Sequence, residues 1–137
     1  MSEIEMTAVL PEGWSRARGY SHVLAYSGGR TIRVAGQVAV ENGAGHVPDG
    51  LAMGAQFAKA LENVVTCVRA AGGAPEHIVN LRVFLTDMAA FKAAGAEIGA
   101  AWGPNLGKHF PAMTVVEITA LYDPAAMIEI EAEAVVP

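Results

Sequence analysis

The chain has 137 residues, a length that suits one domain, and residues 1–137 are expected to form that domain. Its formal net charge is −5 and its nine Lys and Arg residues are scattered, which argues against nucleic acid as a partner. A single cysteine permits no internal disulfide, no apolar run is long enough for a membrane span, and the acidic start lacks the pattern of a signal peptide, so a cytoplasmic location is expected.

The first part of the chain reads as a lead-in followed by two strands. Residues 1–19 are taken as the lead-in because a proline and a glycine interrupt any regular pattern there. The short apolar run 22–26 and the β-branched run 31–40 predict strands, and Gly28-Gly29 between them predicts a hairpin turn. Glycines, a proline and an asparagine then predict a loop over 41–50.

A helix is predicted over residues 51–71, because apolar side chains recur there three and four positions apart. The apolar stripe consists of Met53, Phe57, Ala60, Leu61, Val64 and Val68. The polar side chains off that stripe are Gln56, Lys59, Glu62, Asn63 and Arg69. Gly72-Gly73 ends the helix, since glycine adopts the left-handed conformation of a C-terminal cap at low cost.

A third strand is predicted over 78–85, followed by a second helix. Asp87 is a suitable N-cap for this helix, because a carboxylate can accept hydrogen bonds from the free N–H groups of the first turn. The helix is expected to run to about Trp102, where Gly103-Pro104-Asn105 breaks it.

The last strands are predicted over 114–121 and 127–136, with a turn at Asp123-Pro124. The order β-β-α-β-α-β-β indicates an α/β (α+β) class with helices on one face of a mixed sheet. The sheet is expected to hold more apolar residues than two helices can cover, so its second face is expected to be apolar and buried by association. The residues behind this expectation are Val34, Val38, Val40, Val83, Val115, Ile128 and Ile130.

Several stretches in this order resemble the RidA/YjgF family over residues 14–136. They are Arg18-Gly19-Tyr20-Ser21, Val34-Ala35-Gly36-Gln37-Val38, Leu61-Glu62-Asn63-Val64, Ala70-Ala71-Gly72-Gly73, Phe110-Pro111-Ala112-Met113-Thr114 and Ile128-Glu129-Ile130-Glu131-Ala132. The resemblance implies a ferredoxin-like subunit in a chorismate-mutase-like trimeric barrel, with a small-molecule pocket between neighbouring subunits. It also implies hydrolysis of enamines and imines derived from amino acids, with no cofactor.

The chain departs from the family where the substrate carboxylate is bound. That role falls to an arginine after Pro111-Ala112, since a guanidinium meets both carboxylate oxygens at once, and this chain has Met113 there. Ala35 replaces a usual serine, and Gly95 aligns with an asparagine of some members. We therefore expect a divergent branch that acts on other substrates, such as the aromatic-catabolism intermediate 2-aminomuconate.

Glu129 is the candidate catalytic residue, because it matches a pocket carboxylate of the family and a carboxylate can position water and move its proton. The alternative is an ordinary strand residue, since Glu131 and Glu133 alternate with it. Tyr20 and the strand residues Gly36 and Gln37 are candidate substrate-binding residues. Tyr20 can equally be a packed strand-edge tyrosine, Gly36 a packing glycine and Gln37 a partner of loop backbone.

Met113, Val115 and Glu117 share one strand face and are the remaining candidate substrate-binding residues, forming an apolar floor with a carboxylate at one end. Glu117 can also be a solvated strand residue. Lys108 and His109 precede this strand and are candidates for the positive charge that Met113 lacks, although a solvated loop pair is the simpler reading.

No metal is expected, because the histidines lack ligand spacing and no Cys-x-x-Cys occurs. Three functions remain open: a cofactor-free deaminase or related hydrolase, a non-catalytic metabolite-binding or regulatory trimer, and a ribonuclease, which the acidic balance disfavours.

Overall fold

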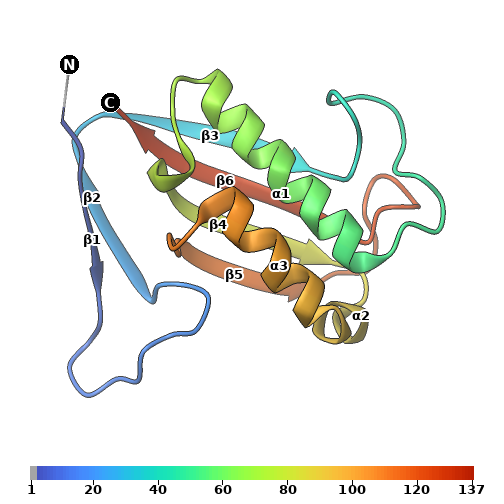
Figure 1. The fold of residues 1–137 in the computed structure, drawn as a ribbon, viewed down its shortest axis with the longest axis horizontal. Helices are drawn as coiled ribbons and strands as arrows, with labels where there is room; N and C mark the ends of the chain where they lie inside the picture. Colours follow the sequence, from blue (N-terminus) through green and yellow to red (C-terminus); the bar gives the residue numbers. More distant parts are fainter. Residues whose placement is uncertain (1–2) are drawn as a thin grey trace.

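The computed structural model describes residues 3–137 and shows a four-stranded sheet with two long helices on one face (Figure 1). The sheet order is β3-β6-β4-β5, and α1 and α3 lie side by side over it. This arrangement confirms the predicted α+β class. The elements are β1 Glu5–Val9, β2 Val23–Ser27, β3 Arg30–Gln37, α1 Met53–Ala70, η1 Pro75–His77, β4 Ile78–Leu85, α2 Met88–Ala93, α3 Gly95–Leu106, β5 Ala112–Glu117 and β6 Ile128–Val136.

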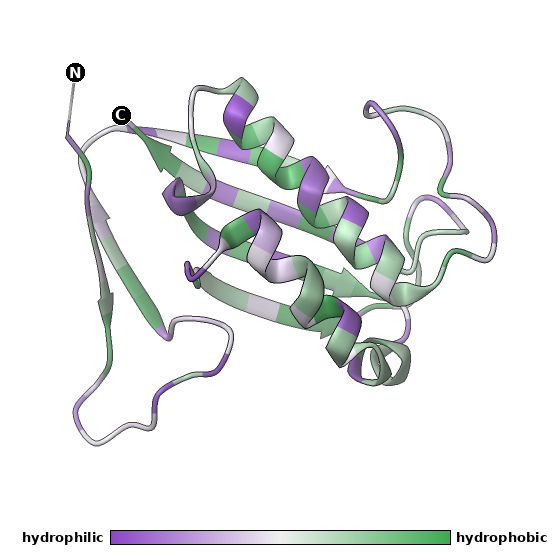
Figure 2. Ribbon diagram, viewed as in Figure 1, coloured by the Kyte–Doolittle hydropathy of each residue, from purple (hydrophilic) through white to green (hydrophobic). Residues whose placement is uncertain are grey.

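The strand β6 lies between β3 and β4 and is antiparallel to both. The edge strand β5 is parallel to β4, because the chain crosses over through α2 and α3 between them. Apolar and charged residues alternate along β6, and Figure 2 shows this banding. The alternation places Ile128 and Ile130 under the helices and turns Glu129 to the other face.

The core lies between the sheet and α1, whose predicted apolar stripe is buried. Gln56 was expected off this stripe, but it is only 1% exposed. Its amide is fully used, since Nε2 donates to the carbonyls of Leu51 (2.8 Å) and Ala125 (3.2 Å), and Oε1 accepts from the Met127 N–H (2.8 Å). These bonds join α1 to the loop that leads into β6.

The expectation of an apolar second sheet face is wrong. Val34, Val83, Ile128 and Ile130 are all buried under the helices, because strand alternation places them on one side. The uncovered face carries charge instead: Glu129, Glu131, Glu133, Arg33 and Arg82. Val38 and Val40 lie beyond β3 in a loop, where Asn63 Nδ2 donates to both their carbonyls at 2.9 Å.

The predicted first hairpin is also wrong, and the lead-in contains a strand. Residues 5–9 form β1, which pairs antiparallel with β2, so that β2 does not pair with β3. The two strands form an arm beside the main sheet (Figure 1). Gly28 and Gly29 do turn the chain with positive φ, but as a corner. A Cβ at Gly29 would lie 2.5 Å from the Val136 carbonyl oxygen, so glycine allows the end of β6 to pass close by.

The second predicted helix is two helices, α2 and α3, joined at Ala94. Asp87 caps α2 as predicted, and its Oδ1 accepts from the Ala90 N–H at 2.9 Å. Pro104 does not end α3, which continues to Leu106 and stops at Gly107 with φ +59°. The turn of α3 beyond its predicted end buries the Leu106 side chain, and this burial stabilises the turn. No helix within residues 3–137 is long and apolar enough to cross a membrane.

Candidate functional site

The expected site residues fall into three separate places within one subunit. Glu129 and Gly36 meet on the uncovered face of the sheet. Met113 and Val115 pack on the opposite face, beside the helices. Tyr20 lies in the segment before β2, next to the arm. A single subunit therefore does not unite these groups.

Gly36 provides the space that the Glu129 side chain occupies. The pairing of β3 with β6 shifts register between Val34 and Gln37, and Gly36 lies in this bulge. A Cβ at Gly36 would overlap Glu129 Oε1 and would lie 2.6 Å from its Cδ and 2.8 Å from its Cγ. The glycine thus fixes where the carboxylate can lie. The hollow around it has a volume of about 310 Å³, and its wall includes Phe84 and Tyr122.

Glu129 differs electrostatically from the two glutamates that follow it on the same face. Glu131 Oε1 lies 2.5 Å from Arg82 Nε, and this hydrogen bond raises the pKa of Arg82. Glu133 Oε1 lies 3.1 Å from Arg33 and 3.6 Å from Arg82. Within residues 3–137, Glu129 has neither an ion pair nor a side-chain hydrogen bond. It is therefore the carboxylate on this face that is available to a substrate or water.

Met113 lies in the wall of an apolar cavity of about 520 Å³ between α3, β5 and the segment before β2. The wall consists of Arg18, Gly19, Phe57, Val83, Phe91, Gly95, Ile98, Gly99, Trp102, Gly103, Gly107, Phe110 and Met113. One of these residues, Arg18, carries a charge. Met113 itself is half-buried against the core, so its position offers neither charge nor donor to a ligand.

Two other candidate polar residues have local structural partners. Glu117 Oε1 accepts from the Met88 N–H at 2.8 Å, which satisfies a free donor at the start of α2. Gln37 Nε2 donates to the Ala35 carbonyl at 3.0 Å, within the same strand. Val115 packs against the core beside Met113 but does not line the cavity.

His109 is likewise held by the fold. Its Nε2 lies 2.6 Å from the Ile78 carbonyl oxygen, and its own carbonyl accepts from Trp102 Nε1 at 3.2 Å. Neither His109 nor the exposed Lys108 lines the Met113 cavity. The cation that does reach this cavity is Arg18.

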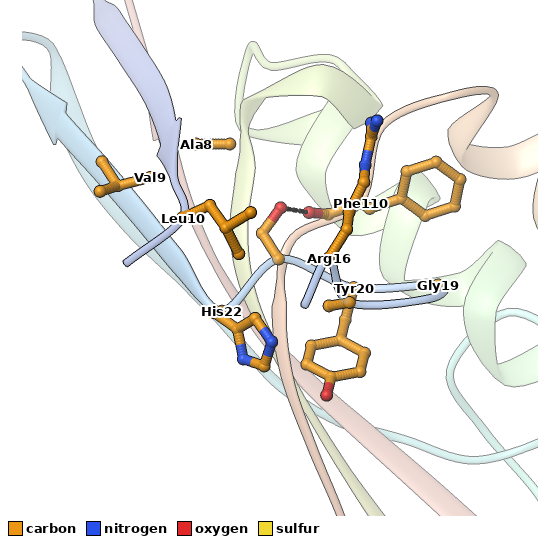
Figure 3. Close-up of a pocket in the computed structure, with 10 residues that line it drawn as sticks. Ala8, Val9, Leu10, Arg16, Gly19, Tyr20, His22 and Phe110 are labelled. Atoms are coloured by element: carbon orange, nitrogen blue, oxygen red, sulfur yellow. Dashed lines mark hydrogen bonds between the residues drawn. The ribbon is translucent and has the colours of Figure 1, made fainter. Parts of the chain in front are cut away.

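Tyr20 lines a second hollow of about 370 Å³ between the arm and the start of β5 (Figure 3). Its ring packs edge-on against His22, with centroids 5.4 Å apart. The neighbouring Ser21 ties this segment to the chain before β5, because its Oγ donates to the Phe110 carbonyl and its N–H to the Pro111 carbonyl (3.1 Å). These bonds place Gly19 and Arg18 at the Met113 cavity.

Two features of the cavity were missed in the sequence. Arg18 precedes Gly19-Tyr20 in one of the stretches that resemble the RidA/YjgF family, and this position was a signal for its place at the cavity. Gly95, Gly99, Gly103 and Gly107 recur every four residues, a spacing that places them on one side of a helix. Among residues 3–137, no group of three or more His, Cys, Asp or Glu side chains is placed to hold a metal ion.

Known proteins with similar sequences and folds are relatives of this chain. The family described as Endoribonuclease L-PSP matches residues 14–136. A protein of unknown function of the conserved Rid family, YyfB from Yersinia pestis, is 32% identical with a TM-score of 0.78, over 96% of this chain and 98% of that one. The YjgF gene product from E. coli is 35% identical with a TM-score of 0.68, over 80% and 83%.

The similarity extends to a ligand-bound structure, E. coli TdcF with bound serine, at 27% identity and a TM-score of 0.65, over 78% of this chain and 81% of that one. No curated protein matches the chain.

Proposed function

The chain belongs to the endoribonuclease L-PSP family, which includes the Rid and YjgF proteins, and on that premise we propose that it is a deaminase or related hydrolase of enamine or imine bonds. Membership supports a small-molecule deaminase or metabolite-binding role in general. The observation that carries the catalytic proposal is Glu129, a carboxylate without an ion pair in residues 3–137, held against Gly36.

The proposed chemistry needs one group that handles protons. Glu129 orients a water molecule and accepts its proton while the water oxygen attacks the imine carbon. The proton passes to the nitrogen and gives a carbinolamine. The hydroxyl proton then moves through the same carboxylate to the amino group, the carbon–nitrogen bond breaks, and a carbonyl compound and ammonia leave. An enamine first gains a proton on carbon and loses one from nitrogen, which gives the imine. No cofactor takes part in this proposal.

The proposed pocket lies between subunits of a homotrimer. Glu129 and Met113 lie on opposite faces of their own sheet, so one copy cannot present both to a single small substrate. A second copy that brings its Glu129 face to the Met113 side resolves this separation. Tyr20, Gly36 and Gln37 are proposed to complete the pocket, and Val115 to support its floor. Glu117 is proposed to act indirectly, through the start of α2.

The substrate is proposed to differ from the small 2-iminoacids made by an amino-acid oxidase, because the cavity wall has Met113 where the carboxylate-binding arginine is expected. An aromatic-catabolism intermediate such as 2-aminomuconate is one such substrate. The alternative is a non-catalytic metabolite-binding or regulatory trimer, and the apolar character of the Met113 cavity favours it. Neither nucleic acid nor a membrane is a proposed partner, given the net charge of −5. A cytoplasmic location is proposed.

The decisive experiment measures hydrolysis of small aliphatic 2-iminoacids, generated by an amino-acid oxidase, in competition with semicarbazide. Wild type should be poor, since a charge-assisted carboxylate contact worth about 2.7 kcal/mol corresponds to roughly 100-fold in rate. Met113→Arg should gain measurable but partial activity, because the new guanidinium lacks supporting partners.

The matched control is the double variant Met113→Arg with Glu129→Gln, which should be inactive while keeping its oligomeric state. A wild-type rate within tenfold of a relative that has the arginine would contradict the substrate argument. If Met113→Arg folds and hydrolyses no 2-iminoacid, the metabolite-binding alternative takes precedence.

A further inference from the structure

We infer that the Met113 cavity binds a monocarboxylic acid with a flat apolar ring, which places the ring against α3 and the carboxylate at Arg18. The inference rests on the proposed function in one respect, because it takes this cavity as the substrate-binding part of the site. It adds the chemical class of the ligand and the residues that select it, and it excludes 2-aminomuconate, which has no ring, from this cavity.

The size of the cavity suits a ring-sized ligand. Its volume of about 520 Å³ lies within the range of roughly 300–1,000 Å³ that is typical of small-molecule sites. A three-carbon acid would leave most of this space empty, and the apolar wall would remain wet. A ring of six carbons with a short side chain fills the space and removes that wall from water.

The walls are aromatic and aliphatic. Phe57 and Phe91 meet edge to face with centroids 6.2 Å apart, and Trp102 and Phe110 stack with planes 8° apart and centroids 5.8 Å apart. The Trp102 Nε1 donor is already used by the His109 carbonyl. Phe57 is buried in the core, whereas Phe91, Trp102 and Phe110 keep exposed surface that can contact a ring and demands no polar partner in return.

Three positions on the side of the cavity formed by α3 have no side chain. Gly95, Gly99 and Gly103 lie on one face of this helix, and a Cβ at any of them would meet nothing within 4 Å. Packing inside the subunit therefore does not require glycine at these positions. Each glycine also lowers helix stability by about 1 kcal/mol relative to alanine. Larger side chains here would occupy the space assigned to the ring.

Arg18 supplies the charge complement. It is exposed, it lines the cavity, and it makes no ion pair within residues 3–137. Gly19 next to it has φ +81°, and Ser21 ties the segment to Phe110 and Pro111, so the backbone that carries Arg18 is fixed beside the cavity. A guanidinium at this place can hold a carboxylate through two parallel hydrogen bonds.

The test is calorimetric titration of the full chain with three probes: 3-phenylpropionate, propionate and 3-phenylpropanol. The first should bind, propionate should bind at least about 100-fold more weakly because it lacks the ring, and the alcohol about 10-fold more weakly because it lacks the charge. Equal affinity for 3-phenylpropionate and propionate, or binding of none, overturns the inference. This comparison needs no variant.

Variants then locate the site. Gly99→Leu fills the cavity from α3 and should remove 3-phenylpropionate binding, whereas the control Ala100→Leu, which adds the same type of side chain at an exposed position outside the cavity wall, should not. Arg18→Gln should weaken the acid about 10-fold and leave the alcohol unchanged. Retained binding in Gly99→Leu, or loss of the oligomer in that variant alone, overturns the inference, since the second result assigns this face to a subunit contact.

The outcomes separate this inference from the proposed function. Ring-selective binding together with no hydrolysis of any imine supports the inference and refutes the deaminase. Imine hydrolysis without preference for a ring supports the deaminase and refutes the inference.

Discussion

Replacement of Gly36 by alanine should displace the Glu129 carboxylate while leaving the fold nearly as stable as before. The added Cβ would overlap Glu129 Oε1 and lie 2.6 Å from Cδ, so the side chain must rotate away. Gly36 does not have a positive φ, so its backbone conformation suits alanine. The clash is with the end of a flexible side chain, which can move without movement of the strand.

Two opposing effects set the change in the free energy of unfolding that Gly36→Ala causes. A Glu129 side chain forced off its preferred rotamer costs about 0.5–1.5 kcal/mol. Alanine in place of glycine lowers the entropy of the unfolded chain and gains about 0.4–1 kcal/mol. Gly36→Ala should therefore change the free energy of unfolding by no more than about 1 kcal/mol, which shifts the melting temperature by a few degrees. In a Glu129→Ala background the clash is gone, so the same change should be stabilising.

Urea unfolding of the four proteins in this double-mutant cycle measures the coupling, which should be about 0.5–1.5 kcal/mol. In the wild-type background Gly36→Ala should also lose imine hydrolysis, or ligand binding at this face, to the extent that Glu129→Ala does. Equal destabilisation in both backgrounds would refute the reasoning, because the strand backbone rather than Glu129 would then be what requires glycine.

Three further outcomes follow from other parts of the molecule. Hydrogen bonds from the N–H groups of Val47 and Ala125 lower the pKa of Asp123. The ionised carboxylate therefore stabilises the fold at pH values above its ordinary pKa of 3.8, and this contribution is lost as the pH falls through the lowered pKa. Asp123→Asn should lower the free energy of unfolding in urea melts at neutral pH, and the loss should become smaller in acid. Pro104→Ala restores a helical N–H at an exposed position of α3 and should raise the free energy of unfolding by about 1–3 kcal/mol. An unchanged or lower melting temperature in calorimetry would contradict this prediction. Light scattering should give three times the 14.2 kDa subunit mass, and a stable monomer at micromolar concentration would disprove the trimer.

Local patterns in the sequence predicted the elements whose stability is local. The apolar stripe of the first helix, the Asp87 cap and the alternation in the last strand all correspond to the structure. Gln56 did not follow its pattern, because the partners of its amide come from the loop before β6. The spacing of residues within the helix carries no information about these hydrogen-bond partners.

Pairing between distant strands was the part that local signals could not supply. The glycine pair at 28–29 gives the same turn signal for a hairpin and for a corner, and only the approach of Val136 distinguishes them. The prediction of an apolar second sheet face failed for a related reason, because it counted the apolar strand residues without knowing the register of the strands. Once β6 pairs with β3 and β4, Val34 and Val83 share the helix side with Ile130.

The candidate site was predictable residue by residue but not as an arrangement. Glu129 and Met113 were found through the resemblance, yet their positions on opposite sheet faces depend on registers that the sequence leaves open. The contact between Gly36 and Glu129 joins the neighbouring strands β3 and β6. An isolated glycine within a strand was the only sign of this contact in the sequence. Arg18 was overlooked because a charge before a turn is usually solvated, and only the Ser21 bonds place it at the cavity.

The position of β6 between β3 and β4 has a consequence for biosynthesis. Residues 128–136 supply the strand that joins both halves of the sheet, and they are translated after every other element described here. A nascent chain that has emerged only through β5 holds β3 and β4 as strands with no partner between them, and each exposes an apolar side. Folding should therefore be completed only after translation of this segment, and ribosome-bound intermediates stalled before residue 128 should be the species that chaperones bind.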